Sequence, residues 1–236
     1  MEPTENNIPK HVGIIIDGNR RFAKRLMLKP WKGHEWGAKK FEKLLEWSQE
    51  YKIKELTLYT FSIENFDRPQ NEFNYLMKLF EKEAISLLKD KRLQENGIKI
   101  NFIGRIHKFP RHIQGLMHEI MNLTKENSNY IVNMAMAYGG RAEIIDATKK
   151  ISQQIKEGKL NIEDINEEVF NKNIYLESEP DLIIRTSESR LSGFLLWQSS
   201  YAEIIFLPEV LWPEFSKEHF TQCLEEYSKR KRRFGN

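Results

Sequence analysis

The chain has 236 residues, 40% of them hydrophobic, which is enough for one large α/β domain or two small ones. Its formal net charge of +3, from 37 basic and 34 acidic residues, gives no bulk electrostatic reason to expect a nucleic-acid partner. The single cysteine, Cys223, excludes an intrachain disulfide, and we expect it to be a buried, inert thiol in a reducing compartment.

The first predicted strand covers residues 12–16 and is followed by Asp17, Gly18 and Asn19, with a helix expected from Phe22 onward. Such strand-to-helix turns lie at the carboxyl ends of strands in open α/β sheets, where backbone N–H groups attract anions. Asp17 would repel an anion unless a cation stood between them. A metal–diphosphate ligand therefore fits this turn, although an Asx-turn or helix N-cap also explains Asp17.

Further along the chain, apolar runs with the length of strands alternate with amphipathic helical patterns. This alternation predicts βαβ units and a mainly parallel sheet of about six strands flanked by helices. We expect a single α/β domain over residues 1–236, with residues 1–10 as a flexible N-terminus. The predicted helices cover residues 37–51, 73–90 and 144–155, and the later strands cover residues 56–61, 98–104, 130–137, 181–186 and 203–207.

Several polar residues fall near the ends of these predicted strands. They are expected to face one cleft, and they are Asp17, Ser62, Asn65, Arg141 and Arg185. Arginine suits phosphate because its fork matches phosphate oxygens in a bidentate way. The sequence has neither a G-x-x-x-x-G-K-[ST] loop nor a G-x-G-x-x-G turn after the first strand, and it has no Cys/His cluster for zinc. The pattern favours phosphate binding that is local and not of these common types.

Six motifs occur in a characteristic order, namely HVGIIIDGNRRFAKR, FSIENFDRP, AYGGRAEI, DLIIRTSESRLSGFLLWQSSYAEIIF, VLWPEF and RRFG. In this order and spacing the chain resembles the cis-prenyltransferases, the undecaprenyl diphosphate synthase family, from about His11 to Gly235. Each motif alone is moderately specific, whereas the ordered series is highly specific. The resemblance implies an α/β fold with a hydrophobic tunnel.

The resemblance also implies a prenyltransferase that repeatedly condenses isopentenyl diphosphate onto an allylic primer, farnesyl or geranylgeranyl diphosphate. Each new double bond would be cis, and the product would be a long-chain polyprenyl diphosphate, the precursor of a lipid glycosyl carrier. The implied cofactor is Mg²⁺. The implied assembly is a homodimer that contacts a membrane peripherally at product release and binds no nucleic acid.

Residue roles carry over where the motifs match. Asp17 resembles the essential aspartate that handles magnesium, and Glu203 a second acid associated with the metal. Asn65 matches a participant in proton removal, which we interpret as an orienting partner because an amide is a poor base. Arg233 would close over a diphosphate near the dimer interface. The other residues implied to bind substrate are Gly18, Asn19, Arg20, Arg21, Phe22, His34, Ser62, Ile63, Glu64, Phe66, Arg68, Arg185, Arg190, Leu191 and Ser192.

Three positions differ from the common family pattern. Pro30 stands where many bacterial members carry an arginine, and the neighbouring Lys29 could replace the charge but not the bidentate geometry. The turn RTSESRLS is one residue shorter than the common form and lacks both of its glycines. Arg20 replaces a glycine of many bacterial sequences. For His34, an ordinary interhelical hydrogen bond remains an alternative to substrate binding.

The apolar stripe of the predicted helix 73–90 has two interpretations. On the residues alone it is core packing. In the family the corresponding helix lines the tunnel for the growing isoprenoid, and Leu76, Leu79 and Phe80 fall on matching positions. Glu83 lies one turn farther on, where an apolar residue is common, and would limit or bend the tunnel.

Two other functions remain open from the sequence. A non-catalytic partner subunit of a cis-prenyltransferase complex would share the fold, but Asp17 and Asn65 argue against it. A phosphate or nucleic-acid binder would use the basic segment KRKRRFGN. No segment reaches the roughly 18 apolar residues of a membrane span, and MEPTENNIPK lacks the apolar core of a signal peptide, so we expect a cytoplasmic protein.

Overall fold

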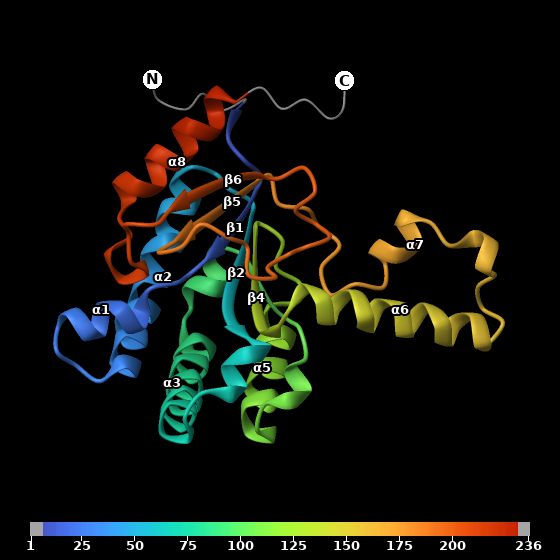
Figure 1. Cartoon of the computed structure of the whole chain (residues 1–236), viewed down its shortest axis with the longest axis horizontal. Helices are drawn as coiled ribbons and strands as arrows, with labels where there is room; N and C mark the ends of the chain where they lie inside the picture. Colours follow the sequence, from blue (N-terminus) through green and yellow to red (C-terminus); the bar gives the residue numbers. More distant parts are fainter. Residues whose placement is uncertain (1–6, 231–236) are drawn as a thin grey trace.

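The apolar runs pair into one parallel sheet in a computed structural model of the chain, which describes residues 7–230 (Figure 1). The six strands have the order β3-β4-β2-β1-β5-β6, and each neighbouring pair is parallel. This confirms the predicted single α/β domain with six parallel strands flanked by helices. The strands are β1 (His11–Ile15), β2 (Glu55–Ser62), β3 (Ile98–Ile103), β4 (Tyr130–Tyr138), β5 (Leu182–Thr186) and β6 (Glu203–Leu207).

Helices cover the sheet because their apolar stripes match its buried rows. Val12 and Ile14 of β1 pack with residues of α2 and α8, whereas Ile100 of β3 and Val132 of β4 pack with residues of α2, α3 and α5. The helices are α1 (Asn19–Arg25), α2 (Gly33–Glu50), α3 (Gln70–Lys89), α4 (Arg92–Glu95), α5 (Arg111–Thr124), α6 (Gly140–Lys156), α7 (Glu167–Asn171) and α8 (Lys217–Lys229).

The other face of the sheet is covered mainly by the segment between α7 and β6. Ile15, Tyr59 and Ile183 form a core there with Phe194 and Leu195, and the rings of Tyr59 and Phe194 are stacked with centroids 5.1 Å apart. In Figure 1, α6 and α7 project away from the sheet as an arm. The strand ends nearest the helices α1 and α3 are the carboxyl ends, where parallel α/β sheets bind ligands.

A glycine is required where β1 turns into α1. Gly18 has φ +107°, which side chains rarely adopt, and a Cβ there would lie 2.2 Å from the Oγ of Ser187. Gly33, at the start of α2, approaches even more closely, because its Cβ would lie 1.9 Å from the backbone oxygen of Asn19. The missing side chains at these two glycines allow α1, α2 and the loop after β5 to approach one another closely at the carboxyl ends of the strands.

The ends of several elements differ from the sequence expectation. The first strand begins at His11, α1 begins at Asn19, and α2 begins four residues before the predicted start. Ile8 packs against the core, and the backbone N–H of Lys10 donates to Asp181, so these residues belong to the folded body. The part of the predicted flexible N-terminus that covers residues 1–6 lies outside the described residues.

The other whole-chain expectations have simpler outcomes. Cys223 is buried as predicted, and burial raises the pKa of its thiol to about 12, which keeps it protonated and unreactive at neutral pH. Between residues 7 and 230, none of the helices is long and apolar enough to span a membrane.

Candidate active site

A cavity of about 870 Å³ lies between α2, α3 and the carboxyl halves of the central strands. One end is polar, and its lining includes Asp17, Arg20, Arg21, His34, Ser62, Asn65, Arg68 and Arg185. The middle is apolar, and its lining includes Phe41, Leu45, Leu58, Leu76, Leu79, Phe80 and Met134. A single space therefore joins a set of cations to an apolar wall, which suits a ligand with an anionic head and a hydrocarbon tail.

Asp17 is fixed by the turn after β1. Its Oδ1 accepts a 2.6 Å hydrogen bond from the N–H of Gly18, and its backbone oxygen accepts from Thr186. The Oδ2 atom accepts from Nη2 of Arg185 at 3.1 Å and from Nη2 of Arg21 at 3.3 Å. The carboxylate is thus held between two arginines while about a third of its surface, 37%, remains exposed.

Arg185 connects the turn after β1 to the loop after β5. Its side chain is only 4% exposed, and its Nη1 donates to the Oγ of Ser192 at 2.7 Å and to the backbone oxygen of Arg190. The Nε atom is buried and has no hydrogen-bond partner among residues 7–230. Since buried donors are normally paired, this N–H is an exception among the polar groups beside the cavity.

The shortened turn RTSESRLS keeps the glycine-like backbone without the glycines. Ser187 has φ +72° and Ser192 has φ +49°, both in the left-handed region that glycine adopts more readily. The N–H of Gly140 donates to the oxygen of Gly193 at 2.7 Å, and the hydroxyl of Tyr59 contacts the oxygen of Ser192 at 3.4 Å. The loop is therefore held in its path by β2 and by the start of α6.

A buried carboxylate organises the second group of cations. Glu72 of α3 is 2% exposed and forms ion pairs with Arg68 at 2.8 Å and with Arg20 at 3.5 Å. The Nη1 of Arg68 also lies 3.2 Å from the Nε2 of His34. Because Arg68 can only donate, Nε2 acts as the acceptor, and His34 is neutral. Glu72 thus brings together Arg20 of α1 and Arg68 of the segment before α3 on the same side of the cavity.

The neutral His34 should make the stability of the protein depend on pH. Burial, together with Arg68 and Arg20, lowers its pKa from 6.5 to about 3. Between these values the unfolded chain binds more protons, so the free energy of unfolding should fall as the pH falls, by up to about 1.4 kcal/mol per pH unit from this group. Denaturant unfolding of the wild type and His34→Gln, at about pH 7 and about pH 5, checks this. We expect the variant to lose less stability on acidification, and parallel pH curves would contradict the assignment.

Asn65 has a local structural role as well as a place in the cavity lining. It lies in the short 3-10 helix η3 (Ile63–Asp67), where its Oδ1 accepts from the N–H of Ser62 at 3.2 Å. This contact uses one of the two lone pairs of the amide oxygen, and the NH₂ group can only donate. Because an amide is also a poor base, this geometry agrees with an orienting role.

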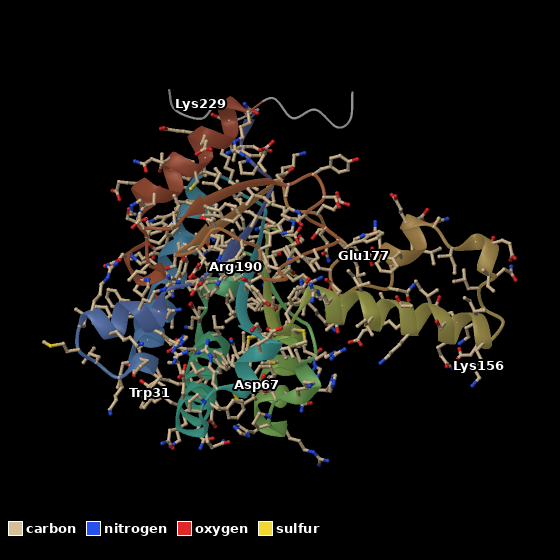
Figure 2. The ribbon with its side chains drawn as sticks, viewed as in Figure 1. Trp31, Asp67, Lys156, Glu177, Arg190 and Lys229 are labelled. Atoms are coloured by element: carbon tan, nitrogen blue, oxygen red, sulfur yellow. The ribbon has the colours of Figure 1, made fainter. Side chains whose placement is uncertain are left out.

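Most of the residues predicted for the site line the cavity, and some do not. Figure 2 labels Arg190, on the loop after β5, and Asp67, at the end of η3. Arg190 is exposed and pairs with Glu188 at 2.8 Å. The cavity lining contains Asp17, Gly18, Asn19, Arg20, Arg21, His34, Ser62, Glu64, Asn65, Arg68, Arg185 and Ser192, but not Phe22, Ile63, Phe66, Arg141, Arg190 or Leu191.

Those outside the lining have other surroundings. Phe66 packs in an aromatic cluster with Phe61 and Phe109, and Leu191 packs against the core beside Tyr59. The exposed Arg141 is on the first turn of α6. The ring of Phe22 lies 5.6 Å from that of Trp36, and neither residue lines the cavity.

Within one chain, the fold does not place Glu203 near Asp17. Glu203 begins β6 and pairs with Leu182, at the amino end of β5, whereas Asp17 follows the carboxyl end of β1. Its carboxylate accepts from Arg230. Asp17 therefore lies at the carboxyl ends of the strands, and Glu203 lies at their amino ends. Arg233 lies outside the described residues.

The donor set fits a magnesium ion that is shared with a ligand. Between residues 7 and 230 there is no group of three or more acidic, histidine or cysteine side chains that could hold a metal alone. Asp17 offers one partly exposed carboxylate beside the arginines. Mg²⁺ commonly takes one or two protein carboxylates and completes its shell with water and substrate phosphates, so a single acid is sufficient.

Two functional candidates were missed in the sequence. Glu72, on the first turn of α3, follows Arg68 by four residues, a spacing that indicates an ion pair but not its burial. Glu188 lines the cavity and pairs with Arg21 at 3.1 Å, although the two residues are far apart in the chain. In the sequence, only its i,i+4 spacing from Arg68 indicates a role for Glu72. No local sequence pattern indicates a role for Glu188.

Comparisons with known proteins agree with this geometry. Residues 15–235 match the family model described as "Putative undecaprenyl diphosphate synthase". The chain is 46% identical over 231 residues to a tritrans,polycis-undecaprenyl-diphosphate synthase (geranylgeranyl-diphosphate specific) of Pyrococcus abyssi, covering 97% of this chain and 87% of that protein. A protein of the same name from Methanocaldococcus jannaschii is 42% identical, with coverage of 98% and 84%.

Among solved structures, the chain is similar to lavandulyl diphosphate synthase from Lavandula x intermedia in complex with dimethylallyl diphosphate. The TM-score is 0.93 and the identity 32%, over 98% of this chain and 100% of the other. The similarity therefore extends over the whole sheet and both sides of the cavity.

Proposed function

Because this chain belongs to the undecaprenyl diphosphate synthase family and is a cis-prenyltransferase, we propose that its cavity binds an allylic diphosphate and elongates it with isopentenyl diphosphate. The observation that carries this proposal is the continuity of one cavity from the cations around Asp17 to the apolar wall of α3. The diphosphate would bind the cations, and the hydrocarbon would lie along the wall. Such an arrangement shields a water-insoluble tail from solvent.

The residues of the polar end have distinct parts in this reaction. The carbon–oxygen bond of the primer breaks and releases diphosphate, the double bond of isopentenyl diphosphate attacks the allylic carbon, and a proton is lost to form the new double bond. Arg20, Arg21 and Arg68, with the N–H groups at the start of α1, would stabilise the leaving diphosphate as its charge grows. Arg185 and Ser192 would bind the second diphosphate.

We assign Asn65 to orienting the condensing unit through its NH₂ group, since its oxygen already accepts from the N–H of Ser62. The departing diphosphate is then the candidate proton acceptor. Asp17 would hold Mg²⁺, which when bound neutralises diphosphate charge. Glu203 could join such a site only from a second copy of the chain, because in its own chain it lies at the amino ends of the strands, away from Asp17.

We favour geranylgeranyl diphosphate as primer and a long polyprenyl diphosphate as product, because the archaeal relatives at 42% to 46% identity carry that specificity in their names. The product would be the precursor of a lipid glycosyl carrier. We propose a homodimer, because it would allow Glu203 of one copy to join the magnesium site of the other. The exposed apolar side chains of Ile145 on α6 and of Ile162 and Ile165 beyond it offer a surface for such an assembly. We place the enzyme in the cytoplasm, where a free thiol stays reduced, with membrane contact at product release.

The test is an incorporation assay with radiolabelled isopentenyl diphosphate. Geranyl, farnesyl and geranylgeranyl diphosphate are each supplied as primer with Mg²⁺, and the products are resolved by length. We expect the highest kcat/KM with geranylgeranyl diphosphate and no turnover after chelation of the metal. Equal use of all three primers would contradict the primer assignment. Absence of incorporation with every primer would contradict the function.

Phe80 separates tunnel lining from core packing. Its ring lines the cavity and also lies 5.7 Å from the ring of Phe61 and 6.2 Å from that of Phe109. Truncating a fully buried phenylalanine costs about 3 to 5 kcal/mol, and the half-buried Phe80 should cost less in Phe80→Ala. If the ring limits the space for the growing chain, the products should become longer. Thermal melting and product-length profiles at a fixed substrate ratio measure both effects.

The matched control is Phe109→Ala. Phe109 is buried and belongs to the same aromatic cluster, but it does not line the cavity. We expect the full stability loss with an unchanged product profile. A changed profile in the control, or an unchanged one in Phe80→Ala, would show that the cavity wall at Phe80 does not set product length.

A further inference from the structure

The corner between α1 and α2 exposes an unusual group of large apolar side chains. We use the name α1–α2 corner for residues 24–36. Within it, Leu26 and Leu28 are each nearly half exposed, Trp36 is 50% exposed, and Met27 is 95% exposed. In Figures 1 and 2 the corner, marked by α1 and by the labelled Trp31, lies at the periphery of the molecule beside the carboxyl ends of the strands. Contiguous exposed apolar residues of this kind mark interaction surfaces.

The backbone at the tip of the corner gives the fold no reason to use methionine there. Met27 has φ +55°, a left-handed conformation in which glycine or asparagine costs less than a residue with a long side chain. Its side chain is almost fully exposed, so it gains little from packing within the chain. An apolar side chain in this position is best explained by a contact outside the chain.

The charges around the tip favour an anionic contact. Lys24, Arg25, Lys29 and Lys32 flank the apolar residues along the sequence. Arg25 is paired with Glu214, and Lys32 with Glu35. Lys24 and Lys29 form no ion pair with any residue from 7 to 230, so the corner keeps an excess of positive charge. A second copy of the same corner would meet it with like charge, which argues against self-association through this surface.

The corner also adjoins the cavity. Lys24 lines the polar end, and α1 itself begins with the cavity residues Asn19 and Arg20. If the proposed function holds, the product has a hydrocarbon tail that water does not dissolve, and it must pass to a bilayer. Apolar and aromatic residues with flanking lysines and arginines are the composition of segments that lie in the interface of an anionic membrane.

We propose that the α1–α2 corner docks on an anionic lipid bilayer, inserting Leu26, Met27 and Leu28 among the acyl chains while its cations contact the headgroups. This inference rests on the proposed function for its biological use, but the contact itself requires no substrate. Docking would bring the polar end of the cavity next to the membrane that receives the product.

The test is cosedimentation of the full chain with vesicles in the absence of substrate. Vesicles of phosphatidylcholine with about one third phosphatidylglycerol should bind the protein, and vesicles of phosphatidylcholine alone should bind it much less. High salt should weaken the binding to the anionic vesicles. Equal binding to both kinds of vesicle, or binding to neither, would overturn the proposal.

Met27→Asn tests the corner without endangering the fold. Asparagine tolerates a positive φ, so the melting temperature should be unchanged or higher. The partition coefficient for anionic vesicles should fall by about tenfold, because an inserted apolar side chain is lost. The matched control is Leu123→Asn, since Leu123 is 45% exposed but lies on α5, outside the corner. It should bind vesicles like the wild type, and an equal loss in the control would overturn the assignment to the corner.

Two further readouts separate the possible failures. Prenyl transfer in detergent solution should be the same for Met27→Asn and the wild type. If the wild type shows no transfer, the proposed function fails, whatever the vesicles show. If transfer is normal but Met27→Asn binds vesicles like the wild type, the docking surface is wrong. If light scattering shows that Met27→Asn dissociates an oligomer, the corner is an interface between copies and the bilayer assignment is overturned.

Discussion

Asp17→Asn is expected to fold normally and to lose turnover by at least about a thousandfold. Asparagine keeps an oxygen that can accept the hydrogen bond from the N–H of Gly18, so the turn after β1 should persist. What disappears is the negative charge that we propose holds Mg²⁺ between the protein and the diphosphate. In the wild type the carboxylate also neutralises part of the positive charge of Arg185 and Arg21. In the variant these arginines are free to attract the diphosphate, which offsets the lost metal contact, so primer affinity should stay close to that of the wild type.

The measurement is single-turnover incorporation across a range of magnesium concentrations, with circular dichroism and a melting curve for the fold. Asp67→Asn is the matched control, because Asp67 is an exposed acid on η3 at the same edge of the sheet and does not line the cavity. We expect it to leave turnover within about twofold of the wild type. Near-normal turnover of Asp17→Asn at saturating magnesium would rule out the proposed role.

Arg185→Lys should reduce turnover by about a hundredfold even though the positive charge is kept. The guanidinium contacts Asp17 through one nitrogen and Ser192 through another, and a single ammonium group cannot hold both positions. Loss of the guanidinium should also release the loop after β5 and lower the free energy of unfolding by about 1 to 3 kcal/mol. We expect KM for isopentenyl diphosphate to rise more than KM for the primer, since Arg185 and Ser192 are assigned to the second diphosphate.

Steady-state kinetics with each substrate varied in turn measure this difference. Arg141→Lys is the control, because Arg141 is exposed on α6 and lies outside the cavity lining. It should leave both KM values and the melting temperature unchanged. A rise in KM for the primer alone would mean that Arg185 serves the first diphosphate and that the two subsites are assigned the wrong way round.

The secondary structure follows closely from local patterns. Each predicted run became a strand, and β1 and β5 are buried along their whole length. The helix predicted over residues 73–90 is three residues longer at its start, because Pro69 fixes the entry to α3 and leaves Gln70 helical. Boundaries such as these depend on capping contacts that the apolar pattern does not record.

The candidate site is only partly predictable in the same way. The motif residues at the ends of β1, β2 and β5 converge as expected, because parallel strands place their carboxyl ends at one edge. Glu203 matches a family motif but lies at the start of β6, and therefore at the amino ends of the strands, away from the cavity. Glu72 and Glu188 were not singled out, because their importance comes from partners on other elements.

The sequence by itself determined the class of fold, the family and the chemical types gathered at the strand ends, since hydrophobic periodicity and ordered motifs are properties of neighbouring residues. The tertiary structure alone decided which of these groups meet. The strand order places β1 between β2 and β5, which brings Asp17 to Arg185 and the apolar face of α3 to the same cavity. Contacts across such separations depend on packing, register and burial along the whole chain, and no local segment encodes them.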